Sequence, residues 1–120
     1  MARTLAAARI DRDAERRLRA FRDDVARAFP SALAGMILFG SRARGDARED
    51  SDYDVAVLLR GGLADDWRLR RKLADMTFDH MLAGTRISPI ALDADEYQEV
   101  GGRTRFELAR RIARDGIAIA

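Results

Sequence analysis

The sequence predicts an α+β fold in which a mixed sheet of about three strands packs against helices. Three short apolar runs, over residues 36–39, 55–59 and 86–92, have the length and composition of buried strands. A helical pattern precedes the first run, another separates the last two, and helices close the chain. This mixed order of strands and helices is typical of a single sheet layer covered by helices.

Length and charge limit the functions to be expected. A chain of 120 residues supports one sizeable core but not two, so we expect a single domain over residues 1–120. Its 22 basic and 20 acidic residues are interspersed, and this pattern predicts no surface for direct binding of nucleic acid. Homo-oligomers and hetero-oligomers are both left open.

The composition also indicates a compartment. There is no cysteine, which excludes disulfides and thiolate metal sites and fits a reducing environment. The apolar segment near the N-terminus is too short for a signal peptide, and no window has the length of a membrane span. We therefore expect a soluble cytoplasmic protein that does not contact a membrane.

The first predicted helix is amphipathic and runs from about Ile10 to Phe29. Its apolar residues recur at every third or fourth position and form one stripe, namely Ile10, Ala14, Leu18, Phe21, Val25 and Phe29. Pro30 disfavours helical geometry at Phe29, so the chain turns there towards the first strand. We assign this helix a scaffold role.

A polar stretch from Gly40 to Asp54 joins the first two predicted strands. Gly40 has no Cβ and lets backbone approach a bound group, and Ser41 adds a hydroxyl beside it, so the pair predicts a phosphate site. Asp52 and Asp54 are two apart on an extended chain, so both carboxylates point to one face of the sheet. Two anions so placed repel each other unless a cation lies between them.

Mg²⁺ is the cation expected at this carboxylate pair, because it takes carboxylate oxygens and completes its shell with waters and substrate phosphates. A Gly-Ser pair alone is usually a turn, and an Asp-x-Asp alone is usually a solvated loop. Together, between two apolar strands, they favour a metal-nucleotide site. Arg42 and Arg44 either add charge for a triphosphate or pair with the acids of the loop, which are Asp46, Glu49 and Asp50.

The second half of the chain predicts further scaffold. A helix over residues 63–82 carries its single histidine, His80, on an apolar stripe, where packing is a more common role than catalysis. Pro89 lacks an N–H, so the strand over 86–92 should lie at an edge or be short. A turn over 96–100 and a closing helix over 104–114 follow, and the apolar tail 117–120 either covers the core or contacts a partner.

The order Gly-Ser, ten residues, Asp-x-Asp resembles the signature of the DNA polymerase β-like nucleotidyltransferase superfamily. The run Gly40-Ser41-Arg42-Ala43-Arg44-Gly45 resembles its minimal nucleotidyltransferase (MNT) branch. The resemblance implies the small polymerase β-like fold, a nucleoside triphosphate bound at Gly40 and Ser41, and Mg²⁺ held by Asp52 and Asp54.

The family's third carboxylate lies on the strand after the long helix. In this chain that strand holds no acid; Ser88 or Ile90 takes the position, and Asp93 follows at the strand's end. The resemblance therefore implies an incomplete two-metal site and leaves open catalysis with one metal or with a base from a partner.

Small stand-alone proteins of the MNT branch are often antitoxins paired with a HEPN-domain ribonuclease, which they silence by transferring AMP to a tyrosine hydroxyl or by binding. The resemblance implies such an Mg²⁺-dependent enzyme, with ATP as the expected nucleotide and a HEPN-domain toxin as partner. A non-catalytic protein of the same fold that binds nucleotide or partner is the alternative. Transfer to a small molecule such as an aminoglycoside fits less well, because the chain has no room for a second domain.

Overall fold

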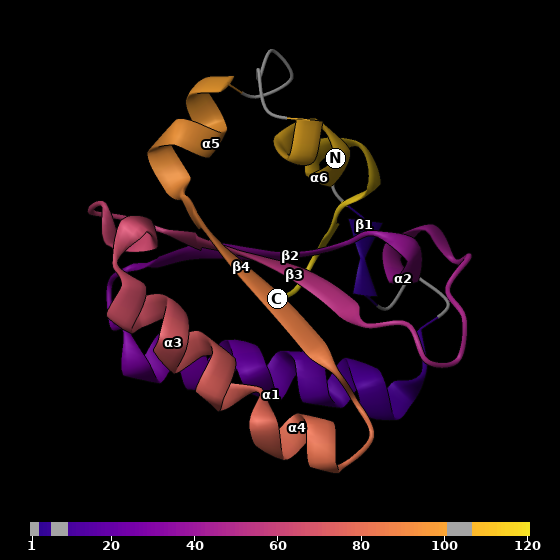
Figure 1. Cartoon of the computed structure of the whole chain (residues 1–120). Helices are drawn as coiled ribbons and strands as arrows, with labels where there is room; N and C mark the ends of the chain where they lie inside the picture. The colour runs from indigo at the N-terminus through magenta and orange to yellow at the C-terminus, as the bar shows by residue number, and fades with distance from the viewer. Residues whose placement is uncertain (1–2, 6–9, 101–106) are drawn as a thin grey trace.

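The computed structural model describes residues 3–5, 10–100 and 107–120, and their strands form one sheet in the order β1-β5-β2-β3-β4 (Figure 1). Three strands have seven residues each: β2 (Leu33–Phe39), β3 (Tyr53–Leu59) and β4 (Ile87–Asp93). β1 (Arg3–Thr4) and β5 (Ile117–Ala118) have two residues each. The sequence predicted the three long strands and missed the two short ones, because two residues show no alternation.

The sheet is mixed, as predicted. β2 is antiparallel to β3 and β5, whereas β3 is parallel to β4 and β1 is parallel to β5. β4 forms one edge of the sheet, which is the position that Pro89 predicted for it.

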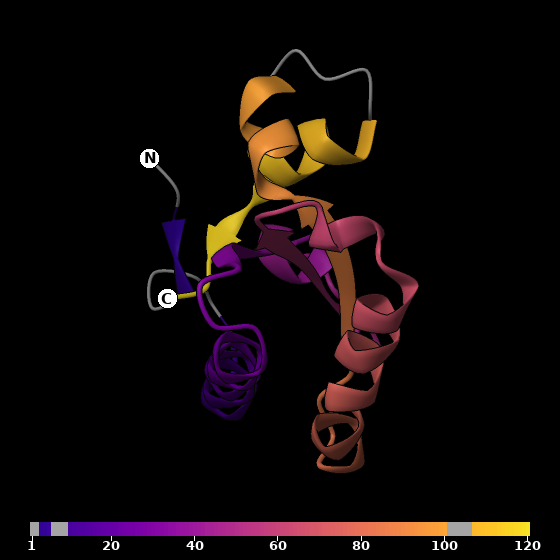
Figure 2. The same ribbon diagram turned by 90° about the vertical axis from the view of Figure 1, so that its left-hand side faces the viewer.

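Helices cover both faces of this sheet (Figures 1 and 2). On one side lie α1 (Arg12–Ala28), α3 (Trp67–Met76) and α4 (Phe78–Leu82). On the other side lie α5 (Ala94–Val100) and α6 (Glu107–Asp115). α2 (Ser41–Arg44) is a single turn directly after β2.

The predicted helix over residues 63–82 is divided into three pieces. A 3₁₀ turn, η2 (Leu63–Asp65), precedes α3, and Asp66 caps α3 by accepting a hydrogen bond from the Arg68 amide at 2.9 Å. Thr77 separates α3 from α4, and its hydroxyl donates to the Ala74 carbonyl at 2.6 Å. These local side-chain hydrogen bonds compete with a continuous helix.

The helices near the C-terminus differ in their bounds from those predicted. Residues 94–100 form a helix where only a turn was expected over 96–100. The expected start of the closing helix at Thr104 lies outside the described residues, and α6 is described from Glu107.

The main core lies between α1 and the sheet. The apolar stripe of α1 packs against alternate residues of the strands, and the buried members include Leu18, Phe21, Val25, Leu38, Val55, Val57 and Leu59. His80 is buried at its edge, with its ring edge-on to Phe21 and its Nε2 3.8 Å from a carboxylate oxygen of Asp24. This environment agrees with the packing role predicted for His80.

The C-terminal tail covers the core, which was one of the two alternatives predicted for it. Ile117 and Ile119 are buried, and the Ile119 amide donates to the Met36 carbonyl at 2.9 Å. Within the described residues, no helix is both long enough and apolar enough to cross a membrane.

Candidate nucleotide and metal site

The sheet brings the two halves of the predicted site together. β2 and β3 are antiparallel neighbours, and their register pairs Phe39, the residue before Gly40, with Asp54. A Cβ built on Gly40 would lie 2.5 Å from Oδ2 of Asp54. Gly40 also has φ 75° and ψ −158°, a conformation that is open in practice only to glycine. The close approach and the backbone conformation therefore both require glycine here.

Asp52 and Asp54 lie on the face of the sheet opposite to the main core. The residue between them, Tyr53, is buried in that core, as the sequence predicted. Burial raises the pKa of Asp54 above its ordinary value, and the nearby charge of Asp52 raises it further, while Arg44 acts in the opposite direction. The effect of Asp52 on Asp54 indicates that the two carboxylates are close enough to repel each other.

The short helix α2 begins where the phosphate site was predicted. The Gly40 carbonyl accepts hydrogen bonds from the amides of Ala43 at 3.1 Å and Arg44 at 3.0 Å, so Ser41 is the first helical residue. Ala43 is buried and holds this turn against the sheet. The first amides of a helix have no acceptor within it, which is the property that a phosphate site uses.

Arg42 anchors the loop before β3. Its guanidinium donates to the carbonyls of Glu49 and Ser51 at 3.0 Å and lies 4.4 Å from the ring centre of Tyr53. Tyr53 points away from the two aspartates, so Arg42 is on the other side of the strand from them. This placement favours pairing within the loop over the phosphate contact that the sequence left open.

Arg44 lies on the aspartate side and joins two segments that are far apart in the sequence. Its Nε is 3.1 Å from Asp46 Oδ2 in the loop, and its Nη1 is 3.4 Å from Asp115 Oδ2 at the end of α6. Asp115 is buried, and hydrogen bonds from Arg114 and then from Arg44 hold its pKa below the ordinary value. Sequence reasoning missed Asp115, because an Asp-Gly pair indicates only the end of a helix.

The register of β4 decides which residue faces the aspartates. Asp54 pairs with Ser88, so Ser88 and not Ile90 lies beside Asp54, where the resemblance led us to expect a third carboxylate. Asp93 pairs with Leu59, five residues further along, or about 16 Å at the usual rise of a strand. Asp93 instead caps α5 by accepting from the Glu96 amide at 2.9 Å. It is therefore too far away to serve as the base.

The residues present fit Mg²⁺ that arrives with a nucleotide. The structure offers two carboxylates beside a cradle that a Cβ on Gly40 would fill. Among the described residues, no three acids, histidines or cysteines gather closely enough to hold a metal by themselves. Mg²⁺ commonly takes one or two protein carboxylates and completes its shell with waters and phosphates, so this sparse donor set suits it.

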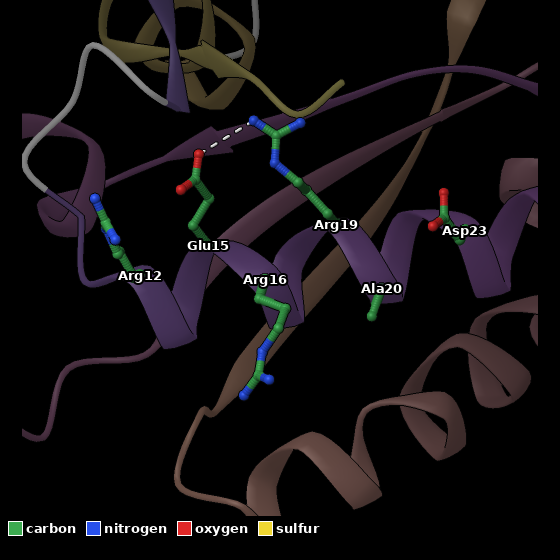
Figure 3. A pocket seen from close by; sticks show the side chains of 6 residues that line it. All are labelled: Arg12, Glu15, Arg16, Arg19, Ala20 and Asp23. Atoms are coloured by element: carbon green, nitrogen blue, oxygen red, sulfur yellow. Dashed lines mark hydrogen bonds and ion pairs between the residues drawn. The ribbon is translucent and has the colours of Figure 1, made fainter.

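A surface hollow elsewhere on the molecule is unrelated to this site. It lies along α1 and is lined by Arg12, Glu15, Arg16, Arg19, Ala20 and Asp23 (Figure 3). An ion pair at 3.1 Å between Glu15 and Arg19 spans one turn of the helix. The lining contains none of the predicted site residues, and its charges are those of a solvated helix face.

A family model described as a nucleotidyltransferase domain matches residues 18–88, which are more than half of the 120 residues. The chain belongs to the nucleotidyltransferase domain family. The matched range includes Gly40, Ser41, Asp52 and Asp54 and ends at Ser88, so it does not reach Asp115. Among curated proteins, no sequence matches the chain.

Solved structures resemble the fold of this nucleotidyltransferase domain. A proposed nucleotidyltransferase from Sulfolobus solfataricus is 20% identical, with 88% of this chain and 82% of that chain covered and a TM-score of 0.48. The toxin-antitoxin MntA-HpeT, in a mutant form, is 19% identical, with 85% and 72% covered and a TM-score of 0.56. The second likeness confirms the predicted α+β fold.

Proposed function

We propose that this domain transfers a nucleoside monophosphate to a hydroxyl group of a partner protein, with ATP as donor and AMP as the transferred group. The partner that we propose is a HEPN-type ribonuclease, which this protein silences as its antitoxin. The observation that carries the proposal is the contact between the Gly40 turn and Asp54, because it brings the phosphate site that we propose next to the metal site that we propose. The likeness to the MntA-HpeT structure supports the choice of partner.

The residues of the chain would divide the work as follows. Gly40 lets the backbone approach the triphosphate, Ser41 donates its hydroxyl to a phosphate oxygen, and Asp52 and Asp54 hold Mg²⁺. When bound, Mg²⁺ supplies positive charge that neutralises the phosphate oxygens. The mutant of MntA-HpeT replaces two aspartates, two positions apart, by glutamate, so that protein has an acid pair at the same spacing.

The transfer exchanges one phosphorus–oxygen bond for another. The acceptor oxygen bonds to the α-phosphorus, the bond from that phosphorus to the bridging oxygen of the β-phosphate breaks, and pyrophosphate leaves. The acceptor proton passes to a base or to water. Binding both reactants in line is the larger part of the catalysis that such a site offers.

A non-catalytic antitoxin that binds nucleotide and partner is the second candidate. The observation that favours it is Ser88, which neighbours Asp54 where a carboxylate would draw the proton from the acceptor. General-base assistance is worth roughly 10²–10⁴-fold in rate, so its absence slows transfer strongly.

The test is a transfer assay with the protein product of a neighbouring gene as the acceptor. The two proteins are incubated with Mg²⁺ and each of the four labelled triphosphates, and label on the neighbour is measured. Transfer from ATP that is lost when Asp52 and Asp54 are both changed to Asn supports the enzyme. Tight binding of the neighbour without transfer supports the non-catalytic antitoxin. If there is neither transfer nor binding, both candidate functions are contradicted.

A further inference from the structure

Arg86 contacts the aspartate site from the neighbouring strand. The parallel register pairs Tyr53 with Ile87, which places Arg86 next to Asp52, one residue earlier on each strand. The Arg86 Nε donates to Asp52 Oδ1 at 2.9 Å, and its Nη2 donates to the Asp50 carbonyl at 3.0 Å. The Tyr53 amide returns a hydrogen bond to the Arg86 carbonyl at 2.8 Å. The guanidinium is therefore held at two points beside the first aspartate.

The charges of the site leave room for one divalent ion rather than two. In a two-metal site, carboxylates bridge ions about 3.5–4 Å apart. Here the two carboxylates face Ser88 on β4 and Arg86 directly before it, so this segment contributes a neutral hydroxyl and a positive charge and no further acid. A second divalent ion would have to displace the guanidinium from Asp52.

We propose that Arg86 is a fixed cation of the site: its guanidinium takes the place of one of two metal ions, and Asp52 and Asp54 bind a single divalent ion together with the nucleotide. This inference rests on the proposed function, because it takes the nucleotide site as given. Arginine suits the role since it stays charged, and its forked donors bind a carboxylate on one edge and a phosphate on another.

The experiment counts metal ions on the full chain. Mn²⁺ is titrated into the protein, alone and with an ATP analogue whose α,β bridge is methylene, and free Mn²⁺ is read by electron paramagnetic resonance. The parent is expected to bind one Mn²⁺ per chain in the presence of the analogue. Arg86→Lys should do the same, since it keeps the charge.

Arg86→Gln should move two affinities in opposite directions. Mn²⁺ alone should bind about two- to fivefold more tightly, because an exposed ion pair that competes for Asp52 is lost. The analogue should bind about tenfold more weakly, because a charged donor for its phosphates is lost. Arg60→Gln is the matched control, since Arg60 is exposed and donates to the carbonyls of Ser31 and Leu33 at the other end of β3.

Five results would overturn the inference. Two Mn²⁺ per parent chain would show that Arg86 does not replace an ion. If both affinities fall together in Arg86→Gln, Arg86 only holds the loop in place. If neither affinity changes, Arg86 has no part in binding the ion or the nucleotide. The same opposed shifts in Arg60→Gln would mean a general charge effect. Should the parent bind no Mn²⁺ with or without the analogue, the proposed function fails and this inference fails with it.

Discussion

The two faces of β3 differ in what their residues do. On one face Tyr53, Val55, Val57 and Leu59 are buried against α1, α3 and their neighbours. On the other, Asp54 follows Asp52 at the start of the strand, with Gly40 and Arg86 beside them. Burial of the apolar face stabilises the strand in its place in the sheet. This stabilisation offsets the repulsion between the two carboxylates on the opposite face.

Residues for stability and residues for binding therefore lie on opposite faces of a single strand. Substitutions on the packed face should lower the free energy of unfolding and change binding only through the fold. Substitutions of Asp52 and Asp54 on the carboxylate face should change binding and leave the fold nearly intact. Substitutions on either face of β3 can therefore test this division.

Phe21→Ala should destabilise the protein by about 3–5 kcal/mol, because it leaves a cavity beneath the packed face. That is a large share of the stability of a small domain, which is about 5–15 kcal/mol. Urea denaturation measures the loss. At urea concentrations where the variant is folded, nucleotide affinity should equal that of the parent, and a weaker affinity there would break the division between the faces.

Changing Asp52 and Asp54 together to Asn should lower Mg²⁺-dependent nucleotide affinity by more than about a hundredfold. Mutating residues that only hydrogen-bond to metal ligands already lowers metal affinity by about 10–100-fold, and these two aspartates are the proposed ligands themselves. The unfolding midpoint should not fall. Calorimetry with ATP and Mg²⁺ measures the affinity, and Glu49→Gln with Asp50→Asn is the control, because it removes equal charge from the exposed loop. Unchanged affinity in the first variant would mean that the site is elsewhere.

Gly40→Ala should cost about 1–3 kcal/mol from its backbone conformation alone and should also lose nucleotide. Gly45→Ala separates the two causes, since Gly45 has φ 86° and a Cβ on it would meet nothing within 4 Å. We expect the control to share the strain but to keep nucleotide affinity. Equal affinities in the two variants would show that the approach of Gly40 to Asp54 has no part in binding.

Ser88→Asp should raise the rate of transfer to a supplied partner by about tenfold, the lower part of what a general base contributes. The register places the new carboxylate beside Asp54. Initial rates of label incorporation are compared with those of Ile90→Asp, which lies two residues further along β4, beside Ala56. A larger gain from Ile90→Asp would mean that the acceptor hydroxyl lies nearer to Ala56 than to Asp54.

The smallest effect concerns pH in the metal-free protein. The pKa of Asp54 is raised in the folded state, so its contribution to stability is full below the ordinary value of 3.8 and is lost as the pH rises through the raised pKa. Asp54→Asn has no carboxylate to ionise, so its stability should not fall over this pH range. The variant should therefore be more stable than the parent at neutral pH by about 0.2–1 kcal/mol. Urea titrations with chelator measure it, with Asp50→Asn as control. A less stable variant at neutral pH would contradict the repulsion.

Much of the fold followed from local patterns. The stripe of α1 repeats every third or fourth residue, and the alternation around Tyr53 is the period of a strand, so burial along each could be predicted before any packing was known. The division into η2, α3 and α4 escaped prediction, because it depends on side-chain hydrogen bonds at Asp66, before α3, and at Thr77, after it. The apolar stripe carries no information about these bonds.

The Gly40-Ser41 turn and the shared face of Asp52 and Asp54 could be predicted from local sequence, because both depend on residues that are neighbours along one chain segment. Three contacts became evident only in the folded chain: Ser88 rather than Ile90 lies beside Asp54, Arg86 pairs with Asp52, and Asp115 contacts Arg44. These contacts join segments from 34 to 71 residues apart. They depend on strand register and helix docking, and a pattern within one segment carries no information about either.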